Sequence, residues 1–289
     1  MKRFGISVLY LTIVLIFVLY SQSFPQSRYA VSVLYTPVLN TPDFESVFGG
    51  SDGSSVKLDN RGLIGEMEFI AFPNTVFSII ETIPKDNYSI LKITTNDYPY
   101  FSSDLFIDSR FVRLLDTLPE DRNQSLPEKS EILFRLKSFE GLPYMWGGNY
   151  GEGIEQLLEF YKPASEPDTE TKSKWCLKGV DCSGLLYQVT DGSTPRNTSS
   201  LITYGEGIDI QNKNAVQIYE LLKPLDLIVW SGHVIIVLDD DTVIQSTPGS
   251  GVHRSDLLSK LKSVLKEKIP VNDWKTTNGK RFVVRRWIE

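Results

Sequence analysis

The sequence predicts an α+β domain over residues 128–289, preceded by a small all-β domain over residues 24–117. In the first half, short runs rich in Val, Ile, Tyr and Phe alternate with turn residues, a pattern typical of a small barrel. The second half opens with apolar residues at helical spacing and has another helical run after Cys182. Apolar β runs joined by polar turns then predict a mostly antiparallel sheet. This order of helices and strands indicates the α+β class.

The composition is that of a folded, moderately acidic protein. The chain has 289 residues, of which 41% are hydrophobic, and its formal net charge is −6 at pH 7. Such a length allows two modest domains. Nucleic-acid binding depends on a basic surface, so the acidic charge makes that function a poor candidate. Cys176 and Cys182 are the only cysteines, which excludes a scaffold held together by several disulfides.

The amino-terminal segment predicts export. Lys2 and Arg3 precede an apolar run over residues 4–20, and small residues follow it, so residues 1–23 are assigned as a signal peptide. The run is at the short edge of what spans a bilayer, and an uncleaved membrane anchor is the less favoured alternative. No cysteine follows closely, so a lipidated amino terminus is not expected. The mature chain is expected in the periplasm, in the cell envelope or outside the cell.

The all-β domain depends on five predicted strands and a polar turn over residues 49–55. The spacing favours a small barrel, and an unrelated β-sandwich is the alternative. The predicted strands cover residues 29–35, 67–72, 76–82, 88–94 and 105–115.

A polar, Pro-containing segment over residues 118–127 is predicted to link the two domains. Ser125 and Glu128 have the spacing of a capping box, and Pro127 lies near the start of the expected helix. The helix is predicted from apolar residues at helical spacing and ends at Gly141. These apolar residues are Ile132, Leu133, Leu136 and Phe139.

A charged insertion is expected over residues 149–180. We expect a solvated polar loop, with a lid or specificity loop as the alternative because both ends adjoin motif residues. A buried helix follows Cys182 and ends near Gly192. The remaining elements are strands over residues 227–230, 233–238 and 242–246, an amphipathic helix over residues 254–268, and a closing strand over residues 281–288.

Cys182 and His233 form the minimum pair for a cysteine nucleophile. Cys182 opens a predicted helix, and His233 opens an apolar strand directly after Gly232. A helix amino terminus and a neighbouring imidazole both favour thiolate, so we expect a lowered thiol pKa. Taken alone, a free cysteine is more often a packing residue and a lone strand histidine a core residue. The cysteine and histidine spacings match no usual zinc pattern.

Five ordered motifs resemble those of the NlpC-type cell-wall peptidases, the bacterial branch of the papain-like cysteine peptidases. The resemblance covers roughly residues 128–289, and an ordered series is far more specific than any one motif. It implies a papain-like catalytic domain that needs no cofactor. The β domain loosely resembles the bacterial SH3-like domains that often precede NlpC-type domains. The motifs are Leu142-Pro143-Tyr144-Met145-Trp146-Gly147-Gly148, Asp181-Cys182-Ser183-Gly184, Leu222-Lys223-Pro224-Leu225-Asp226-Leu227-Ile228, Gly232-His233-Val234 and Val243-Ile244-Gln245-Ser246.

The resemblance implies a catalytic role for three of these residues. Cys182 is the expected nucleophile, and His233 is the base that takes the thiol proton and later protonates the leaving amine. Gln245 follows on the next predicted strand, from which its amide can orient the imidazole. A buried amide bonded to backbone is the alternative for Gln245.

Other residues carry roles only through the resemblance. Tyr144 is implied to hold the oxyanion together with the Cys182 backbone amide. Asp181 and Ser183 are implied to contact the free amine or neighbouring backbone of the substrate. The segment with Arg196 resembles a Pro-Arg-Thr-like motif, but Leu201 stands where Gln is frequent, so the role of Arg196 is in doubt. Cys176 carries no motif and is expected to be structural, and His253 is expected on the surface.

The resemblance implies an exported cysteine endopeptidase that hydrolyses peptidoglycan stem peptides at the bond between γ-D-glutamate and a diamino acid. Peptidoglycan or its fragments is the expected partner, without metal or nucleic acid. An amidase of the related CHAP type, or an acyltransferase on the same fold, is one rival, and Tyr144 favours a peptidase over it. A catalytically silent wall-binding protein is another rival, and the complete set of Cys182, His233 and Gln245 argues against it.

Overall fold

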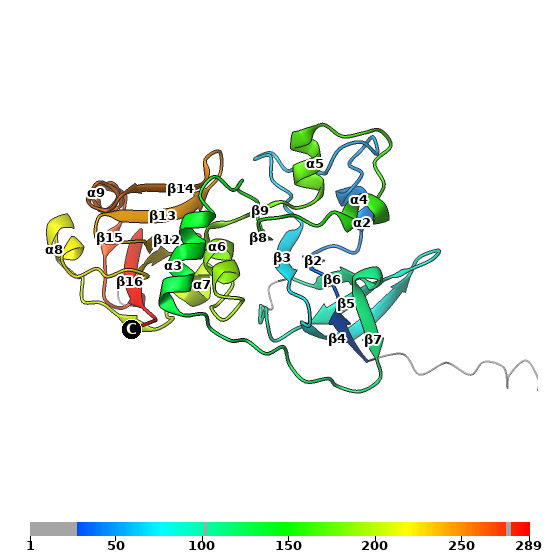
Figure 1. The fold of residues 1–289 in the computed structure, drawn as a ribbon, viewed down its shortest axis with the longest axis horizontal. Helices are drawn as coiled ribbons and strands as arrows, with labels where there is room; N and C mark the ends of the chain where they lie inside the picture. The colour runs from blue at the N-terminus through cyan, green and yellow to red at the C-terminus, as the bar shows by residue number, and fades with distance from the viewer. Residues whose placement is uncertain (1–27, 101–102, 276–278) are drawn as a thin grey trace, which may run out of the picture.

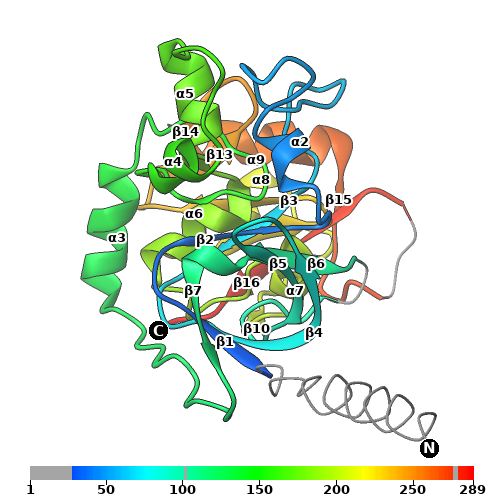
Figure 2. The same ribbon diagram turned by 90° about the vertical axis from the view of Figure 1, so that its right-hand side faces the viewer.

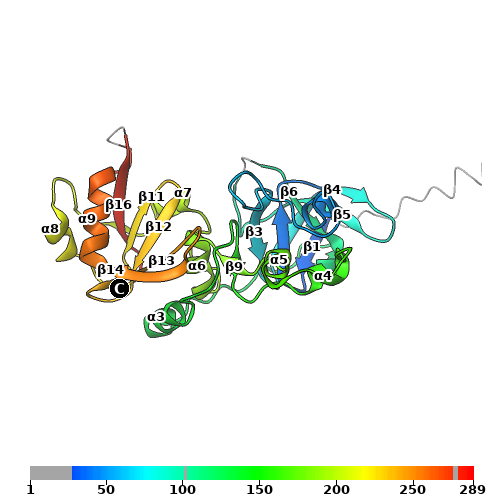
Figure 3. The same ribbon diagram turned by 90° about the horizontal axis from the view of Figure 1, so that it is seen from above.

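The chain forms two lobes that lie side by side (Figures 1 and 3). The computed structural model describes residues 28–100, 103–275 and 279–289. The export segment predicted over residues 1–23 lies outside the described residues. Within the described residues, no helix is both long enough and apolar enough to cross a membrane.

The amino-terminal lobe is a seven-stranded sheet in the order β3-β2-β6-β5-β4-β1-β7, with antiparallel neighbours throughout. A short helix, α2 (Phe44–Val47), follows β2. The strands are β1 (Tyr29–Ser32), β2 (Thr36–Leu39), β3 (Met67–Ala71), β4 (Val76–Pro84), β5 (Ser89–Thr94), β6 (Leu105–Asp108) and β7 (Val112–Leu115). The assignment of this lobe as an SH3-like barrel stays a prediction.

Of the five predicted strands, one is shortened and one is divided in the structure. The strand expected over residues 29–35 ends at Ser32, whose hydroxyl donates to the Phe72 carbonyl (2.5 Å). The strand expected over residues 105–115 is interrupted by the 3-10 helix η1 (Ser109–Phe111), which is capped by Asp108. Periodicity alone revealed neither break. At Ser32 the side chain bonds to a remote carbonyl, and at Asp108 a local side-chain hydrogen bond to the Arg110 amide starts the 3-10 turn.

The carboxyl-terminal lobe has helices on both faces of an antiparallel sheet in the order β10-β16-β11-β12-β13-β14, which confirms the α+β prediction. Its helices are α3 (Lys129–Ser138), α6 (Cys182–Val189), α7 (Thr198–Leu201), α8 (Ala215–Tyr219) and α9 (Leu257–Glu267). Its strands are β10 (Glu206–Gly207), β11 (Leu227–Trp230), β12 (His233–Val237), β13 (Thr242–Thr247), β14 (Gly251–Asp256), β15 (Ile269–Pro270) and β16 (Arg281–Arg286).

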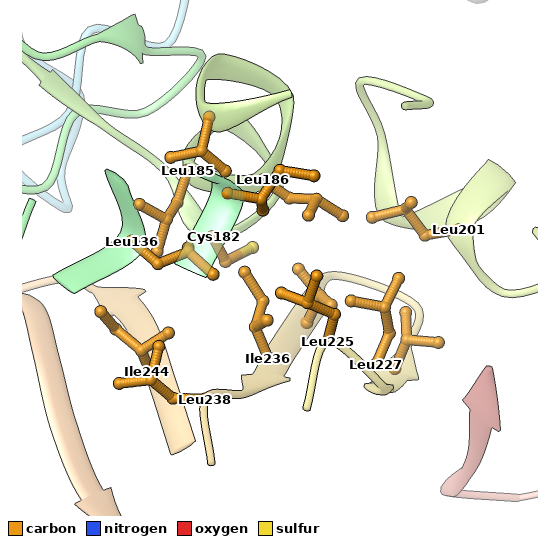
Figure 4. Packing of buried hydrophobic residues seen from close by; sticks show 14 of the residues in the cluster. Leu136, Cys182, Leu185, Leu186, Leu201, Leu225, Leu227, Ile236, Leu238 and Ile244 are labelled. Atoms are coloured by element: carbon orange, nitrogen blue, oxygen red, sulfur yellow. The ribbon is translucent and has the colours of Figure 1, made fainter. Parts of the chain in front are cut away.

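Two apolar clusters hold this lobe together, one on each face of the sheet. Val234 and Ile236 of β12 pack in the cluster that contains α3 and α6. The alternate residues Ile235 and Val237 pack in the cluster that contains α8 and α9, as expected for a strand buried on both faces. Figure 4 shows Cys182 in the first cluster, beside the leucines of α6 and facing the sheet.

Two predicted helix boundaries are wrong. Residues 251–256 form strand β14, which pairs with β13, and the helix begins only at Leu257. Asp256 caps that helix by accepting from the Ser259 amide (2.7 Å), so the residues before it, predicted to be helical, lie outside the helix. At α3 the N-cap is Glu128, which makes no side-chain cap hydrogen bond, so the predicted capping box with Ser125 does not form.

The predicted insertion is folded and is not a solvated polar loop. It contains β8 (Asn149–Tyr150), α4 (Gln156–Phe160), α5 (Thr169–Trp175) and β9 (Gly179–Val180). Leu157, Trp175 and Leu177 are fully buried in the core of the amino-terminal lobe. These apolar residues are spaced among many charged ones, so they gave no periodic signal. The insertion carries the chain back to the first lobe (Figure 1), where the ring of Tyr161, directly after α4, stacks on Phe44 of α2 with ring centroids 6.0 Å apart.

The predicted linker, residues 118–127, runs outside the two sheets from β7 to α3 (Figure 2). The lobes are also joined by direct contacts. Asn149 accepts from the Ile70 amide and donates to the Ile70 carbonyl, both at 2.8 Å. The rings of Tyr35 and Tyr150 stack with their centroids 3.6 Å apart. The two lobes therefore meet next to the segment that leads into Cys182.

Candidate active site

Cys182 is the first residue of α6 and is 7% exposed. Asp181 caps this helix, because its carboxylate accepts from the Gly184 amide (2.6 Å). A Cβ at residue 184 would meet the Gly148 carbonyl oxygen, so only glycine allows this close approach. The Cys182 thiol donates to the Gly232 carbonyl with a sulfur-to-oxygen distance of 4.0 Å. The sulfur therefore lies beside the backbone that leads into His233.

His233 opens β12 and is held by a neighbouring amide. Its Nε2 lies 2.8 Å from Oε1 of Gln245 on β13. The Gln245 side chain is buried and its Nε2 lies 3.1 Å from Nε2 of His253 on β14. Nδ1 of His253 lies 3.0 Å from the Gly251 carbonyl oxygen. His253 is therefore half-buried and part of a connected polar row, so its expected place on the surface is wrong.

The thiol and the imidazole flank the same short stretch of backbone. The sulfur contacts Gly232, and the His233 ring packs against Trp230 with ring centroids 5.1 Å apart. In the described part of the chain no hydrogen bond joins Cys182 to His233. Apo active sites often hold catalytic pairs in such loose geometry, which tightens when substrate binds.

The expected lowering of the thiol pKa is wrong for this structure. Burial raises the pKa of the Cys182 thiol to about 12, and the neighbouring Asp181 carboxylate adds to the rise. Burial also lowers the pKa of His233. Desolvation opposes the charged form of both groups, and here it outweighs the helix amino terminus. Both shifts favour the neutral forms, thiol and neutral imidazole, and a neutral imidazole can act as a general base.

This protonation state predicts slow alkylation of the thiol at neutral pH. In a Cys176→Ser variant, the rate of reaction of Cys182 with iodoacetamide should rise about tenfold per pH unit between roughly pH 7 and 10, because only thiolate reacts. Mass spectrometry of the alkylated protein measures the rate. A rate that is already at its plateau at pH 7 would show that a thiolate–imidazolium pair exists at rest.

Asp181 and Ser183 are bound to a buried arginine. Arg196, which is 2% exposed, donates to both carboxylate oxygens of Asp181 (2.7 and 3.0 Å) and to the Ser183 hydroxyl (3.0 Å). It also reaches Asn149 (3.2 Å), the residue that joins the lobes. The role of Arg196 was in doubt from the sequence, and the structure places it as the counter-ion beneath the nucleophile.

A cavity of about 510 Å³ opens over Cys182 at the junction of the lobes. Tyr144 and Trp146 line it from the carboxyl-terminal lobe, and burial raises the pKa of the Tyr144 hydroxyl. Glu68, on β3 of the other lobe, lines it as well, and its carboxylate accepts from Asn40 (2.9 Å) and from Tyr98 (2.8 Å). Both donors are neutral. Glu68 thus brings a charge into the cavity that no motif in the sequence pointed to.

Cys176 lies away from the nucleophile, at the end of α5, and is buried. Both cysteines are free thiols. Burial raises the pKa of the Cys176 thiol to about 11. Its burial and position indicate a packing residue where the insertion returns to β9.

Comparisons with known proteins give one curated relative and several solved structures with some similarity. No family model matches the chain. Over 130 residues, which make up 44% of this chain, it is 25% identical to a γ-D-glutamyl-L-lysine dipeptidyl-peptidase of Bacillus subtilis (strain 168). The chain spans only 34% of the length of that relative.

Solved structures with some similarity are an NlpC/P60 family protein from Bacillus cereus ATCC 10987 and NlpC2 from Trichomonas vaginalis. The first is 15% identical with a TM-score of 0.34, and the match covers 91% of this chain and 64% of that one. The second is 12% identical with a TM-score of 0.35, and the match covers 92% and 99%.

Proposed function

We propose that this chain, a relative of the NlpC-type cell-wall peptidases as its motifs predicted, is a cysteine peptidase that hydrolyses peptidoglycan stem peptides. The observation that carries the proposal is the position of Cys182. Its thiol lies at the start of a capped helix, borders a cavity between the lobes, and contacts the Gly232 carbonyl directly before His233, whose imidazole is held by Gln245.

The proposed reaction uses the neutral thiol and the neutral imidazole. His233 Nδ1 takes the proton of Cys182 as the sulfur attacks the substrate carbonyl. The contact between the thiol and the Gly232 carbonyl must break before the proton is transferred. The Tyr144 hydroxyl and the Cys182 backbone amide stabilise the oxyanion. The imidazolium then protonates the leaving amine, and water hydrolyses the thioester with His233 again as the base.

The cavity favours a substrate with a free amino terminus. A substrate ammonium needs an anionic partner, and the charge of Asp181 is already balanced by Arg196. The two donors to Glu68 are neutral, so we assign the ammonium to Glu68. The relative in Bacillus subtilis is named a dipeptidyl-peptidase, and enzymes of that kind recognise a free amino terminus. We propose cleavage after γ-D-glutamate, two residues from that terminus.

The proposed substrate lies outside the cytoplasm, which agrees with the export segment predicted over residues 1–23. Stem peptides, both free and still attached to glycan, are incubated with the full chain to test the function, and mass spectrometry identifies the new termini. Release of an intact L-Ala-γ-D-Glu dipeptide is the expected result. Cleavage between the glycan and the peptide would instead indicate an amidase, and unchanged peptides would indicate a wall-binding protein without activity.

Glu68→Gln should lower kcat/KM for stem peptides with a free amine by about 10- to 100-fold, as expected for a charge-assisted hydrogen bond of about 1.5–3 kcal/mol. Peptides with an acetylated amine should be cleaved equally slowly by both proteins. Glu66→Gln is the matched control, because Glu66 pairs with Lys57 (2.7 Å) and does not line the cavity. If Glu68→Gln leaves the preference for a free amine intact, the assignment of Glu68 is wrong.

A further inference from the structure

We propose that His253 is a positioning residue: it fixes the orientation of the Gln245 amide and thereby the tautomer of His233. The catalytic meaning of this role rests on the proposed function, but the hydrogen-bonded row does not. The row runs across three adjacent strands, from the Gly251 carbonyl through His253 and Gln245 to His233.

The Gly251 carbonyl can only accept a hydrogen bond, and this fixes the direction of each hydrogen bond in the row. The Gly251 carbonyl accepts, so Nδ1 of His253 carries the proton that it donates (3.0 Å). In a neutral imidazole the other nitrogen is then a lone pair. Nε2 of His253 must therefore accept, and the amide nitrogen of Gln245 donates to it (3.1 Å).

The same reasoning determines the tautomer of His233. With its amide nitrogen turned toward His253, Gln245 presents Oε1 to His233, whose Nε2 donates to it (2.8 Å). Nδ1 of His233 is then the lone pair, as a general base requires. If the amide were reversed, it would donate to His233 Nε2, and the proton would move to Nδ1. Nδ1 of His233 would then carry a proton and could not accept one from the thiol.

The structure holds both ends of this row in place. Gln245 and His253 are direct partners in the register of β13 and β14. Gly251 has a φ of 63°, and a Cβ there would meet the Leu142 carbonyl oxygen, so close packing fixes its backbone. Gln245 alone could present either end of its amide to His233, because a glutamine amide is nearly symmetric in shape. The hydrogen bond from Gln245 to His253 determines which end of the amide faces His233.

The chain contains only two histidines, so nitrogen NMR can test the row directly. The full chain, labelled with ¹⁵N in histidine and measured at a pH well above the ordinary pKa of imidazole, should show two rings with opposite tautomers. The expected result is Nε2–H for His233 and Nδ1–H for His253. Assignment comes from the loss of one ring in each single variant. An Nδ1–H tautomer for His233 in the unmodified protein would overturn the proposal.

Two substitutions at one position separate positioning from packing. His253→Phe keeps a ring but has no acceptor, so His233 should become a mixture of tautomers. The value of kcat should fall in proportion to the fraction of His233 that loses the Nε2–H tautomer, about twofold for an even mixture. His253→Gln restores an acceptor and should recover the Nε2–H tautomer and most of kcat, with KM unchanged. Thermal unfolding confirms that each variant is folded.

The NMR result does not depend on turnover. If the proposed peptidase function fails but His233 changes tautomer in His253→Phe, the positioning role stands. If the tautomer of His233 is the same in folded His253→Phe as in the unmodified protein, His253 does not orient Gln245. Equal losses of kcat in the Phe and Gln variants would also contradict the proposal.

Discussion

Cys182→Ala should abolish the hydrolysis of stem peptides while the protein stays folded. The proposed reaction passes through a thioester, which an alanine side chain cannot form. The side chain lost is small, and α3, α6 and the sheet remain packed around the position. We therefore expect no product by mass spectrometry and only a small shift of the thermal midpoint.

Cys176→Ala is the matched control, since it removes the other buried thiol at a distance from the cavity. It should keep full activity, with or without reductant. Activity above a trace in folded Cys182→Ala would mean that the nucleophile is misassigned. Loss of activity in Cys176→Ala that reductant does not restore would point to a structural effect of the insertion.

Arg196→Met should destabilise the protein by about 3–5 kcal/mol, because it leaves the buried Asp181 carboxylate without its counter-ion. Asp181 caps α6 and accepts from the Gly147 amide (3.1 Å), so it cannot turn toward solvent without loss of these bonds. Arg196 also donates to Asn149, which ties the lobes together. Urea unfolding, followed by tryptophan fluorescence, measures the change.

The double variant Asp181→Asn with Arg196→Met tests the cause. If the unpaired Asp181 carboxylate causes most of the destabilisation in Arg196→Met, the double variant should be more stable than Arg196→Met alone. The neutral amide at position 181 no longer needs a counter-ion. Arg254→Met is the control for loss of an exposed pair. Its partner is Glu140 (2.5 Å) at the surface, where such pairs contribute at most about 1 kcal/mol. A loss below about 1 kcal/mol in Arg196→Met would contradict the prediction.

The insertion shows why a sequence pattern can mislead. Its charged residues predicted a solvated loop, yet Trp175 and Leu177 are fully buried in the amino-terminal lobe. Helices α4 and α5 are too short to give a clear period. Their burial depends on a partner surface that lies far earlier in the chain, and local composition has no information on that surface.

The sequence by itself determined the start of α6, the three strands within residues 227–247, and the pairing of His233 with Gln245. Those features depend on short-range causes: a cap, strand alternation and a hairpin that sets the register. Tertiary structure alone decided the rest. Glu68 enters the cavity, His253 meets Gln245, and burial raises the pKa of the Cys182 thiol only because remote segments pack together. The pKa of a buried group depends on all the segments that exclude water from it, and these segments come together only in the folded chain.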